Sequence, residues 1–218
     1  KVMIPVFRTL SDKIGRERVI WRYDPILFTD QYNPQYHLRA FEQIAKELYG
    51  YTSRCVISFA DTYAKNKKSM EALGAFSLTE QDLTAFAGEI AQIAAGYNIK
   101  TASCAEAADL SSCGIEHGCC IDKEFIENIT GCRIRAGKDR NQRSECGCIE
   151  SIDVGAYNTC RNGCRYCYAN DSPERVSNTC RLYDAHSPLL CGSITKDDRI
   201  TERDVTSWKE SQLTLWDL

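Results

Sequence analysis

Three cysteines in the C-terminal half of the chain have a spacing that suits an inorganic cluster. Cys160, Cys164 and Cys167 form the pattern CxxxCxxC, so three thiolates can reach one face of a compact metal centre. A four-iron cluster takes four ligands, and a local set of three either recruits a distant cysteine or leaves one iron open to a small molecule. Zinc would suit two closely spaced pairs, which Cys146 with Cys148 and Cys164 with Cys167 supply. Buried thiols without metal are the remaining alternative.

A second set of cysteines is centred on the CxC pair of Cys146 and Cys148, which can bind one metal ion or two irons of one cluster. Cys104 ends a predicted strand, and Cys120 precedes a predicted helix, whose N-terminus favours a thiolate. We predict an auxiliary [4Fe–4S] cluster on these four cysteines. A structural zinc ion on the same ligands is the main alternative, and His117 could replace one of them. We do not predict Cys113, Cys119 or Cys132 as ligands of this cluster.

The distribution of the cysteines favours bound metal over a disulfide framework. The chain has 13 cysteines in 218 residues, yet only Cys55 precedes Cys104, and it stands in an apolar run typical of a core. An odd number of cysteines, their absence from most of the first half and the lack of a secretory signal indicate a reducing compartment. We therefore predict a cytoplasmic protein.

The overall composition excludes other classes of protein. Hydrophobic residues make up 43% and charged residues 26% of the chain, and no apolar run has the length of a membrane span. The formal net charge is −3, so bulk charge gives no reason to expect a nucleic acid or an anionic membrane. The chain does not begin with Met, and residues 2–15 already read as a helix with Phe7, Leu10 and Ile14 on one face. We expect that an N-terminal portion of the fold is missing.

Strands and helices alternate in the first part of the chain. The predicted strands cover residues 17–23, 55–60 and 99–104, and the predicted helices between them cover residues 36–49 and 79–97. Asp24-Pro25 is expected to close the first strand, Gly50 to end the first of these helices, and Thr79 with Asp82 to cap the second. A βαβαβ order predicts parallel strands with right-handed crossovers. The predicted fold class is therefore α/β, a partial or permuted (β/α) barrel with a loop-rich iron–sulfur region.

Polar residues follow the predicted strands at their carboxyl ends, where α/β sheets and barrels bind ligands. Arg22 and Asp24 belong to the first strand end, Asp61 to the second and Glu106 to the third. We predict that these four residues form a catalytic rim. The alternative is that they are ordinary loop residues that begin the connections.

The composition and the pattern of the sequence change after residue 106. We divide the chain into a βα-repeat part (residues 1–106), a cysteine-rich iron–sulfur region (107–191) and a polar tail (192–218). The middle region has one predicted helix at residues 122–129 and a strand-like run at 152–157. Its basic stretch at residues 133–143 is either a solvated loop or an anion-binding segment.

The tail ends in a short apolar peptide. Gln212, Leu213, Leu215 and Trp216 follow a polar segment, which is the form of a tethered docking peptide. The peptide resembles the motif with which bacterial replication and repair proteins bind the sliding clamp, and it implies a clamp partner and a DNA-related role. The alternative is that these side chains fold back onto their own domain.

An aromatic residue, Tyr166, directly precedes the last cysteine of CxxxCxxC, and Tyr157-Asn158 and Tyr168-Ala169 flank the motif. This pattern resembles the signature of the radical S-adenosylmethionine (radical SAM) enzymes. The resemblance implies a [4Fe–4S] cluster on Cys160, Cys164 and Cys167, whose open iron chelates S-adenosylmethionine. It also implies that Tyr166, Tyr157 and Asn158 bind the cofactor, with Tyr166 beside the adenine, and that a flavodoxin or ferredoxin supplies electrons.

The order of the parts differs from the usual radical SAM order, in which most of the barrel follows the motif. Here the βα units precede it, an order that resembles an uncharacterised bacterial family, a domain of unknown function with C-terminal cysteines of radical SAM type. The likeness extends over Trp21–Pro25, Cys120–Asp122, Asn141–Cys148 and Ser151–Asn170. We predict a radical SAM-like enzyme that generates a 5′-deoxyadenosyl radical, with an unknown substrate. The alternative is a non-catalytic iron–sulfur or zinc protein in which the metal is structural or transfers electrons.

Overall fold

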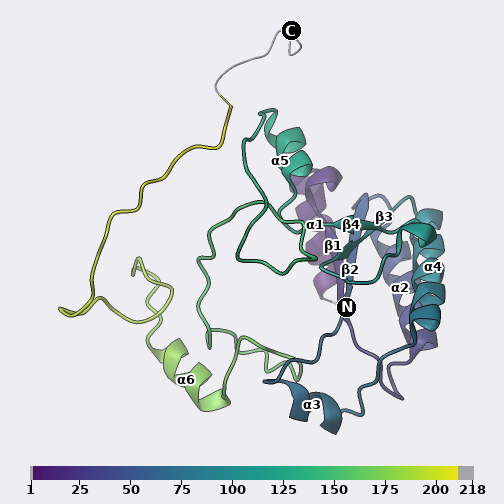
Figure 1. Ribbon diagram of the computed structural model, residues 1–218, viewed down its shortest axis with the longest axis horizontal. Helices are drawn as coiled ribbons and strands as arrows, with labels where there is room; N and C mark the ends of the chain where they lie inside the picture. The colour runs from purple at the N-terminus through teal and green to yellow at the C-terminus, as the bar shows by residue number, and fades with distance from the viewer. Residues whose placement is uncertain (1, 211–218) are drawn as a thin grey trace. The chain divides into compact units, whose positions relative to one another are not determined.

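The computed structural model describes residues 2–210, which divide into two compact units. The first, here called the sheet unit, consists of Lys1–Ala60, Gly74–Ser151 and the segment that starts at Trp208. The second, the motif unit, consists of Asp61–Leu73 and Ile152–Ser207. Figure 1 labels the elements of both units. No helix within residues 2–210 has the length and apolar character that a membrane crossing requires.

The sheet unit is built on four parallel strands in the order β1-β2-β3-β4. The strands are β1 (Trp21–Ile26), β2 (Arg54–Phe59), β3 (Lys100–Cys104) and β4 (Glu116–Gly118). In the register of the sheet, Trp21 lies beside Cys55, and Cys55 lies beside Thr101. The prediction of an α/β fold with parallel strands is confirmed. The short strand β4, which the sequence did not predict, brings the chain after it to the end of β3.

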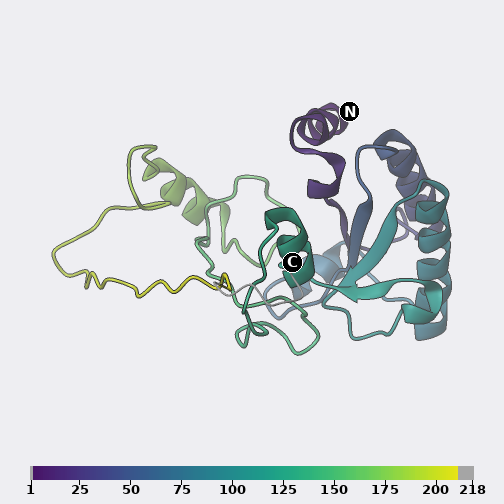
Figure 2. The same cartoon turned by 90° about the horizontal axis from the view of Figure 1, so that it is seen from above.

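Helices cover the sheet and begin where capping residues fix them. The helices of this unit are α1 (Met3–Ile14), α2 (Pro34–Leu48), α4 (Glu80–Gly96) and α5 (Lys123–Thr130). The N-cap side chains of Asn33, Thr79 and Asp122 accept hydrogen bonds from the first turns of α2, α4 and α5. Gly50 follows α2 with φ of 82°, a left-handed conformation that favours glycine. Helices α2 and α4 lie side by side on one face of the sheet (Figure 2).

The core lies between the sheet and these two helices. Phe41 of α2 is fully buried and stacks on Trp21 of β1 with ring centroids 4.5 Å apart. Ile57 of β2 and Ile90 of α4 are also fully buried. Cys55 is fully buried in the same cluster, which confirms its predicted place in the core. This core fixes the strand ends on which the polar residues stand.

The first strand starts and ends later than the sequence predicts. Residues 16–18 form a 3₁₀ turn, and the strand continues through Asp24 and Pro25 to Ile26. A proline lacks the N–H group that a central strand needs, but β1 pairs only with β2 in the described part of the chain. The pairing is interrupted between Tyr23 and Ile26, where the register shifts. The expectation that Asp24-Pro25 ends the strand was therefore wrong.

The helix predicted at the start of the chain is confirmed, but only part of its apolar face packs against the core. Ile4 and Phe7 pack against the core, whereas Leu10 and Ile14 are 45% and 40% exposed. Helix α1 thus contacts the core through its N-terminal half.

The motif unit has little regular structure. It contains α3 (Lys67–Ala72) and α6 (Pro173–Arg181), which the sequence did not predict. The run at residues 152–157 was expected to be strand-like, but it forms no strand. Such a run needs a neighbouring strand, and none lies beside it among the described residues. The predicted docking peptide with Gln212, Leu213, Leu215 and Trp216 lies outside the described residues.

Candidate functional site

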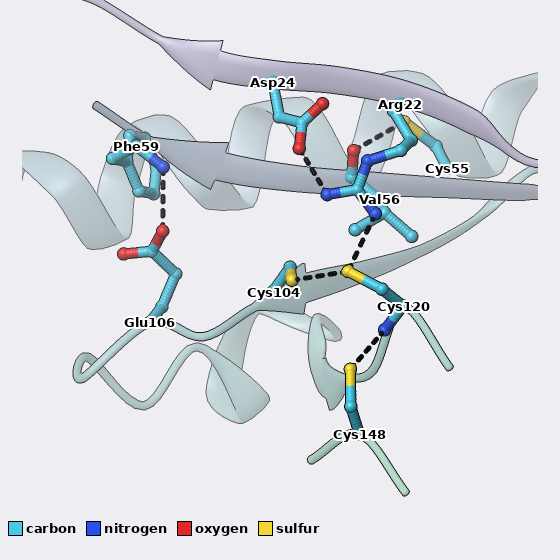
Figure 3. Close-up of polar contacts among 9 residues, drawn as sticks. All are labelled: Arg22, Asp24, Cys55, Val56, Phe59, Cys104, Glu106, Cys120 and Cys148. Atoms are coloured by element: carbon cyan, nitrogen blue, oxygen red, sulfur yellow. Dashed lines mark hydrogen bonds and ion pairs between the residues drawn. The ribbon is translucent and has the colours of Figure 1, made fainter. Parts of the chain in front are cut away.

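Two cysteines meet at the carboxyl end of the sheet. Cys104 is the last residue of β3, Cys120 follows β4, and their sulfur atoms are 3.1 Å apart (Figure 3). A disulfide bond would be about 2.0 Å long. Two thiolates on one tetrahedral metal ion would lie about 3.8 Å apart, given metal–sulfur bonds of about 2.3 Å. The pair is therefore a pair of free thiols that a small side-chain rotation would bring to the spacing of a shared metal ion.

Close packing of β4 against β3 makes this approach possible. A Cβ atom on Gly118 would lie 2.8 Å from Cβ of Ala102 and 3.1 Å from the carbonyl oxygen of Ser103. Any side chain at Gly118 would therefore push the strands apart and move Cys120 away from Cys104. Glycine is needed here for the close approach of two backbones.

Cys148 is held next to this pair by the backbone. Its sulfur accepts hydrogen bonds from the N–H groups of Cys120, at 3.2 Å, and Ile121, at 3.4 Å. The backbone of its loop is tied to the same segment, because Ile149 N–H donates to the carbonyl oxygen of Ile121 at 3.1 Å. Cys146 interacts with the backbone and the side chain of Cys148. We call Cys104, Cys120, Cys146 and Cys148 the sheet-end cluster.

The thiols of Cys104 and Cys120 in the sheet-end cluster have different pKa values. A hydrogen bond from Cys120, assisted by Arg22, lowers the pKa of Cys104 to about 7 against the opposing effect of burial. The same hydrogen bond raises the pKa of Cys120. Burial raises the pKa of Cys146 and raises that of neighbouring Cys119 to about 11. Cys104 is therefore the more easily deprotonated thiol of the pair near neutral pH, and Cys120 keeps its proton.

One of the four predicted rim residues, Arg22, contacts these thiols, and a second, Asp24, contacts Arg22. Arg22 of β1 donates a hydrogen bond to the sulfur of Cys120 at 3.2 Å and forms an ion pair with Asp24 on the same strand (Figure 3). Glu106 instead accepts the backbone N–H of Phe59 at 2.8 Å, which satisfies the end of β2. Asp61 belongs to the motif unit, where it accepts the hydroxyl of Tyr63 at 3.1 Å.

The three cysteines of CxxxCxxC line one cavity of the motif unit. Cys160, Cys164 and Cys167 all border this cavity, whose volume is about 600 Å³. A turn joins the last two, with Cys167 N–H donating to the carbonyl oxygen of Cys164 at 3.1 Å. The amide of Asn170 donates to the carbonyl oxygen of Cys160 at 2.8 Å. The local sequence thus folds so that three cysteines border one open cavity, here called the motif cavity.

A network of charged residues forms another wall of the motif cavity. Asp171 accepts hydrogen bonds from Lys65 at 2.6 Å, Arg175 at 2.8 Å and Asn158 at 3.0 Å. The hydrogen bond from Lys65 makes the largest contribution to holding the pKa of Asp171 well below its ordinary value. Lys65 also lies 5.7 Å from the ring centroid of Tyr157. Lys65 and Asp171 were not predicted, because nothing in the sequence links a lysine before α3 to a residue far along the chain.

The three residues predicted to bind the cofactor are not among those that line the motif cavity, but each contacts a residue that does. Asn158 and Tyr157 contact the Lys65–Asp171 pair, which borders the cavity. Tyr166 contributes its carbonyl oxygen, which accepts the side-chain amide of Asn66 at 3.3 Å.

Both sets of cysteines offer thiol groups of the kind that bind metals, but their side chains are not arranged around a metal position. Within residues 2–210, no three side chains of the types Cys, His, Asp or Glu are already arranged to hold a metal ion. Thiolates are nevertheless the preferred ligands of iron–sulfur clusters and of structural zinc. In the sheet-end cluster the sulfurs of Cys104 and Cys120 contact each other, and the sulfur of Cys148 accepts the backbone N–H of Cys120. The three cysteines of the motif border one cavity. The donor chemistry of both sets therefore fits a thiolate-bound metal.

The fold and these sites define an α/β protein with a parallel sheet and two groups of free thiols. The chain belongs to a family described as a domain of unknown function, DUF1848, whose model matches residues 1–169. The matched range contains all seven predicted ligand cysteines. Neither a curated protein nor a solved structure matches the chain.

Proposed function

We propose that this chain is an iron–sulfur enzyme of the radical SAM type, with its open-site [4Fe–4S] cluster on Cys160, Cys164 and Cys167. The observation that carries the proposal is that these three cysteines border one cavity of about 600 Å³. This volume lies within the range of roughly 300–1,000 Å³ in which proteins bind small molecules. A cluster bound there would supply the electron that cleaves S-adenosylmethionine to a 5′-deoxyadenosyl radical, which abstracts hydrogen from the substrate.

The residues of the chain would bind and orient these groups. The three thiols act as thiolate ligands, and the hydrogen bond from Asn170 fixes the backbone at Cys160. Asp171, tied to Lys65 and Asn158, holds the cavity wall in place.

We propose that the sheet-end cluster holds a second metal centre. An auxiliary [4Fe–4S] cluster or one zinc ion would use Cys104, Cys120, Cys146 and Cys148. The support is the 3.1 Å approach of two sulfurs and the two N–H donors on a third. The four ligands come from the end of β3, the segment after β4 and one loop, so the metal would join three segments of the sheet unit.

The remaining parts of the proposal concern fold, partners and location. The four parallel strands would be part of a (β/α) barrel, and the protein would work in the reducing cytoplasm with a flavodoxin or ferredoxin as electron donor. If the peptide from Gln212 to Trp216 binds a sliding clamp, the substrate would be DNA-related.

One observation favours the non-catalytic alternative. The two N–H donors to Cys148 resemble the outer-shell hydrogen bonds that support structural metal sites. A protein that uses metal only to hold its loops would need the sheet-end cluster and would have no use for S-adenosylmethionine.

The two functions differ in whether the loaded protein cleaves S-adenosylmethionine. The full chain is reconstituted anaerobically with iron and sulfide, reduced with dithionite and incubated with S-adenosylmethionine. We expect 5′-deoxyadenosine from the unaltered protein and none from Cys164→Ala, which should lose one cluster and keep the other. Cys132→Ser is the control, because its thiol donates only to the carbonyl oxygen of Thr130 at 3.4 Å. Full iron loading without 5′-deoxyadenosine would support the non-catalytic alternative.

A further inference from the structure

We propose that Arg22 is an outer-shell residue of the sheet-end cluster, which supports the Cys120 thiolate when metal is bound, and that Asp24 positions Arg22 for this task. The inference rests on the second metal centre of the proposed function. It changes the predicted role of both residues from catalytic to positioning. Outer-shell hydrogen bonds orient metal ligands and tune the metal.

The geometry uses the fork of the guanidinium group. One terminal nitrogen of Arg22 donates to the sulfur of Cys120 at 3.2 Å, and the other donates to Asp24. Arg22 and Asp24 are two positions apart on β1, so their side chains leave the strand on the same side. The Asp24 side chain is only 17% exposed, which limits its freedom to leave the guanidinium. The planar fork can therefore hold a sulfur and a carboxylate at once, which the single ammonium of lysine does less well.

The charge of the site explains why a cation is useful there. Four thiolates around one divalent ion or one oxidised [4Fe–4S] core leave roughly two negative charges. Arg22 brings a positive charge into direct contact with one of the sulfurs. The other nearby cation, Arg54, is engaged with Asp122 at 2.8 Å. Net charge and hydrogen bonds to sulfur set the reduction potential of an iron–sulfur cluster. Arg22 should therefore raise the potential and strengthen metal retention.

The test uses the full chain with Cys160, Cys164 and Cys167 replaced by Ala, so that any remaining metal belongs to the sheet-end cluster. Into this background we would introduce Arg22→Gln, Arg22→Lys and Asp24→Asn separately. Arg8→Gln is the matched control, because Arg8 also forms an ion pair in the sheet unit, with Glu47 of α2. Each protein is loaded anaerobically with iron and sulfide, or with zinc, and then challenged with a chelator.

We expect Arg22→Gln to hold metal roughly 10- to 100-fold less tightly than the background, the usual effect of losing an outer-shell partner. Asp24→Asn should show a smaller loss, and Arg8→Gln should show none. Where the metal is an iron–sulfur cluster, its reduction potential should become more negative in Arg22→Gln, and Arg22→Lys should restore it in part. If Arg22 had a purely structural role, the positive charge of Arg22→Lys would not restore the reduction potential.

The outcomes separate the inference from the proposed function. Metal retention and potential in a folded Arg22→Gln equal to those of the background would overturn the inference and leave the metal centre intact. Failure of the background protein to bind either metal would overturn the centre and the inference together. If circular dichroism shows that Arg22→Gln does not fold, Asp24→Asn decides, and unchanged retention in that variant refutes the inference.

Discussion

Replacement of Tyr23 by Phe should destabilise the sheet unit by about 1–3 kcal/mol without disturbing its packing. The hydroxyl of Tyr23 lies 2.8 Å from Nδ1 of buried His37, and Nε2 of His37 lies 3.1 Å from the carbonyl oxygen of Leu27. Because a carbonyl oxygen can only accept, Nε2 carries the proton and Nδ1 accepts from Tyr23. Phe keeps the ring, which packs edge-on against Phe41 at 5.1 Å, but it leaves a buried acceptor unpaired.

The same pair should make stability depend on pH. Burial lowers the pKa of His37 below its ordinary value of 6.5. The unfolded chain therefore takes up a proton at a higher pH than the folded chain does. The stability that neutral His37 contributes is complete above pH 6.5, declines as the pH falls below that value and is lost below the folded-state pKa.

Urea unfolding followed by circular dichroism measures both effects. The free energy of unfolding is compared at about pH 7.5 and about pH 5.5 for the unaltered chain, Tyr23→Phe and His37→Gln. Tyr49→Phe, on a side chain that is 55% exposed, is the control for loss of a hydroxyl. The loss of stability at low pH should be smaller in His37→Gln. Equal stability of Tyr23→Phe and the unaltered chain, or an unchanged pH dependence in His37→Gln, would refute this assignment of the buried pair.

Three further predictions follow from the packing and the two sites. Cys148→Ala should remove metal from the sheet-end cluster, and unchanged metal content by elemental analysis would contradict its role as a ligand. Phe41→Ala should lower the free energy of urea unfolding by about 3–5 kcal/mol, because a fully buried ring stacked on Trp21 is lost; a much smaller loss would show that the core refills the space. Asp171→Asn should weaken the wall that Lys65 ties together and speed limited proteolysis of residues 158–171, whereas unchanged cleavage would show that the charge of Asp171 does not hold that segment.

The regular part of the fold could be predicted because local signals and global packing agree there. Thr79 with Asp82 marks the start of α4, and Gly50 marks the end of α2, as the structure confirms. The first strand was misplaced because a proline usually ends a strand, and the sequence does not reveal that β1 is at the edge of the sheet. The motif unit gave no periodic signal, since most of its residues are irregular.

The candidate sites could be predicted in part. Local spacing is enough to single out Cys160, Cys164 and Cys167, because they lie within one turn-rich segment. The contact between Arg22 and Cys120 joins residues 98 positions apart, which no local pattern encodes. Only the parallel register of the sheet, with β4 added beside β3, brings these two residues to the same end.

The spatial order of the strands is also the order in which they are synthesised. Each strand from β2 to β4 pairs with the strand made just before it, so the sheet can grow as the chain leaves the ribosome without waiting for a later segment. Cys104 and Cys120 then meet early, while Cys146 and Cys148 are still to be made. During that interval the nascent chain holds a close dithiol without Cys146 and Cys148. In the proposed function, metal delivery to the sheet-end cluster would therefore be a step that follows translation of residue 148, and a reducing environment would keep the pair from oxidising until then.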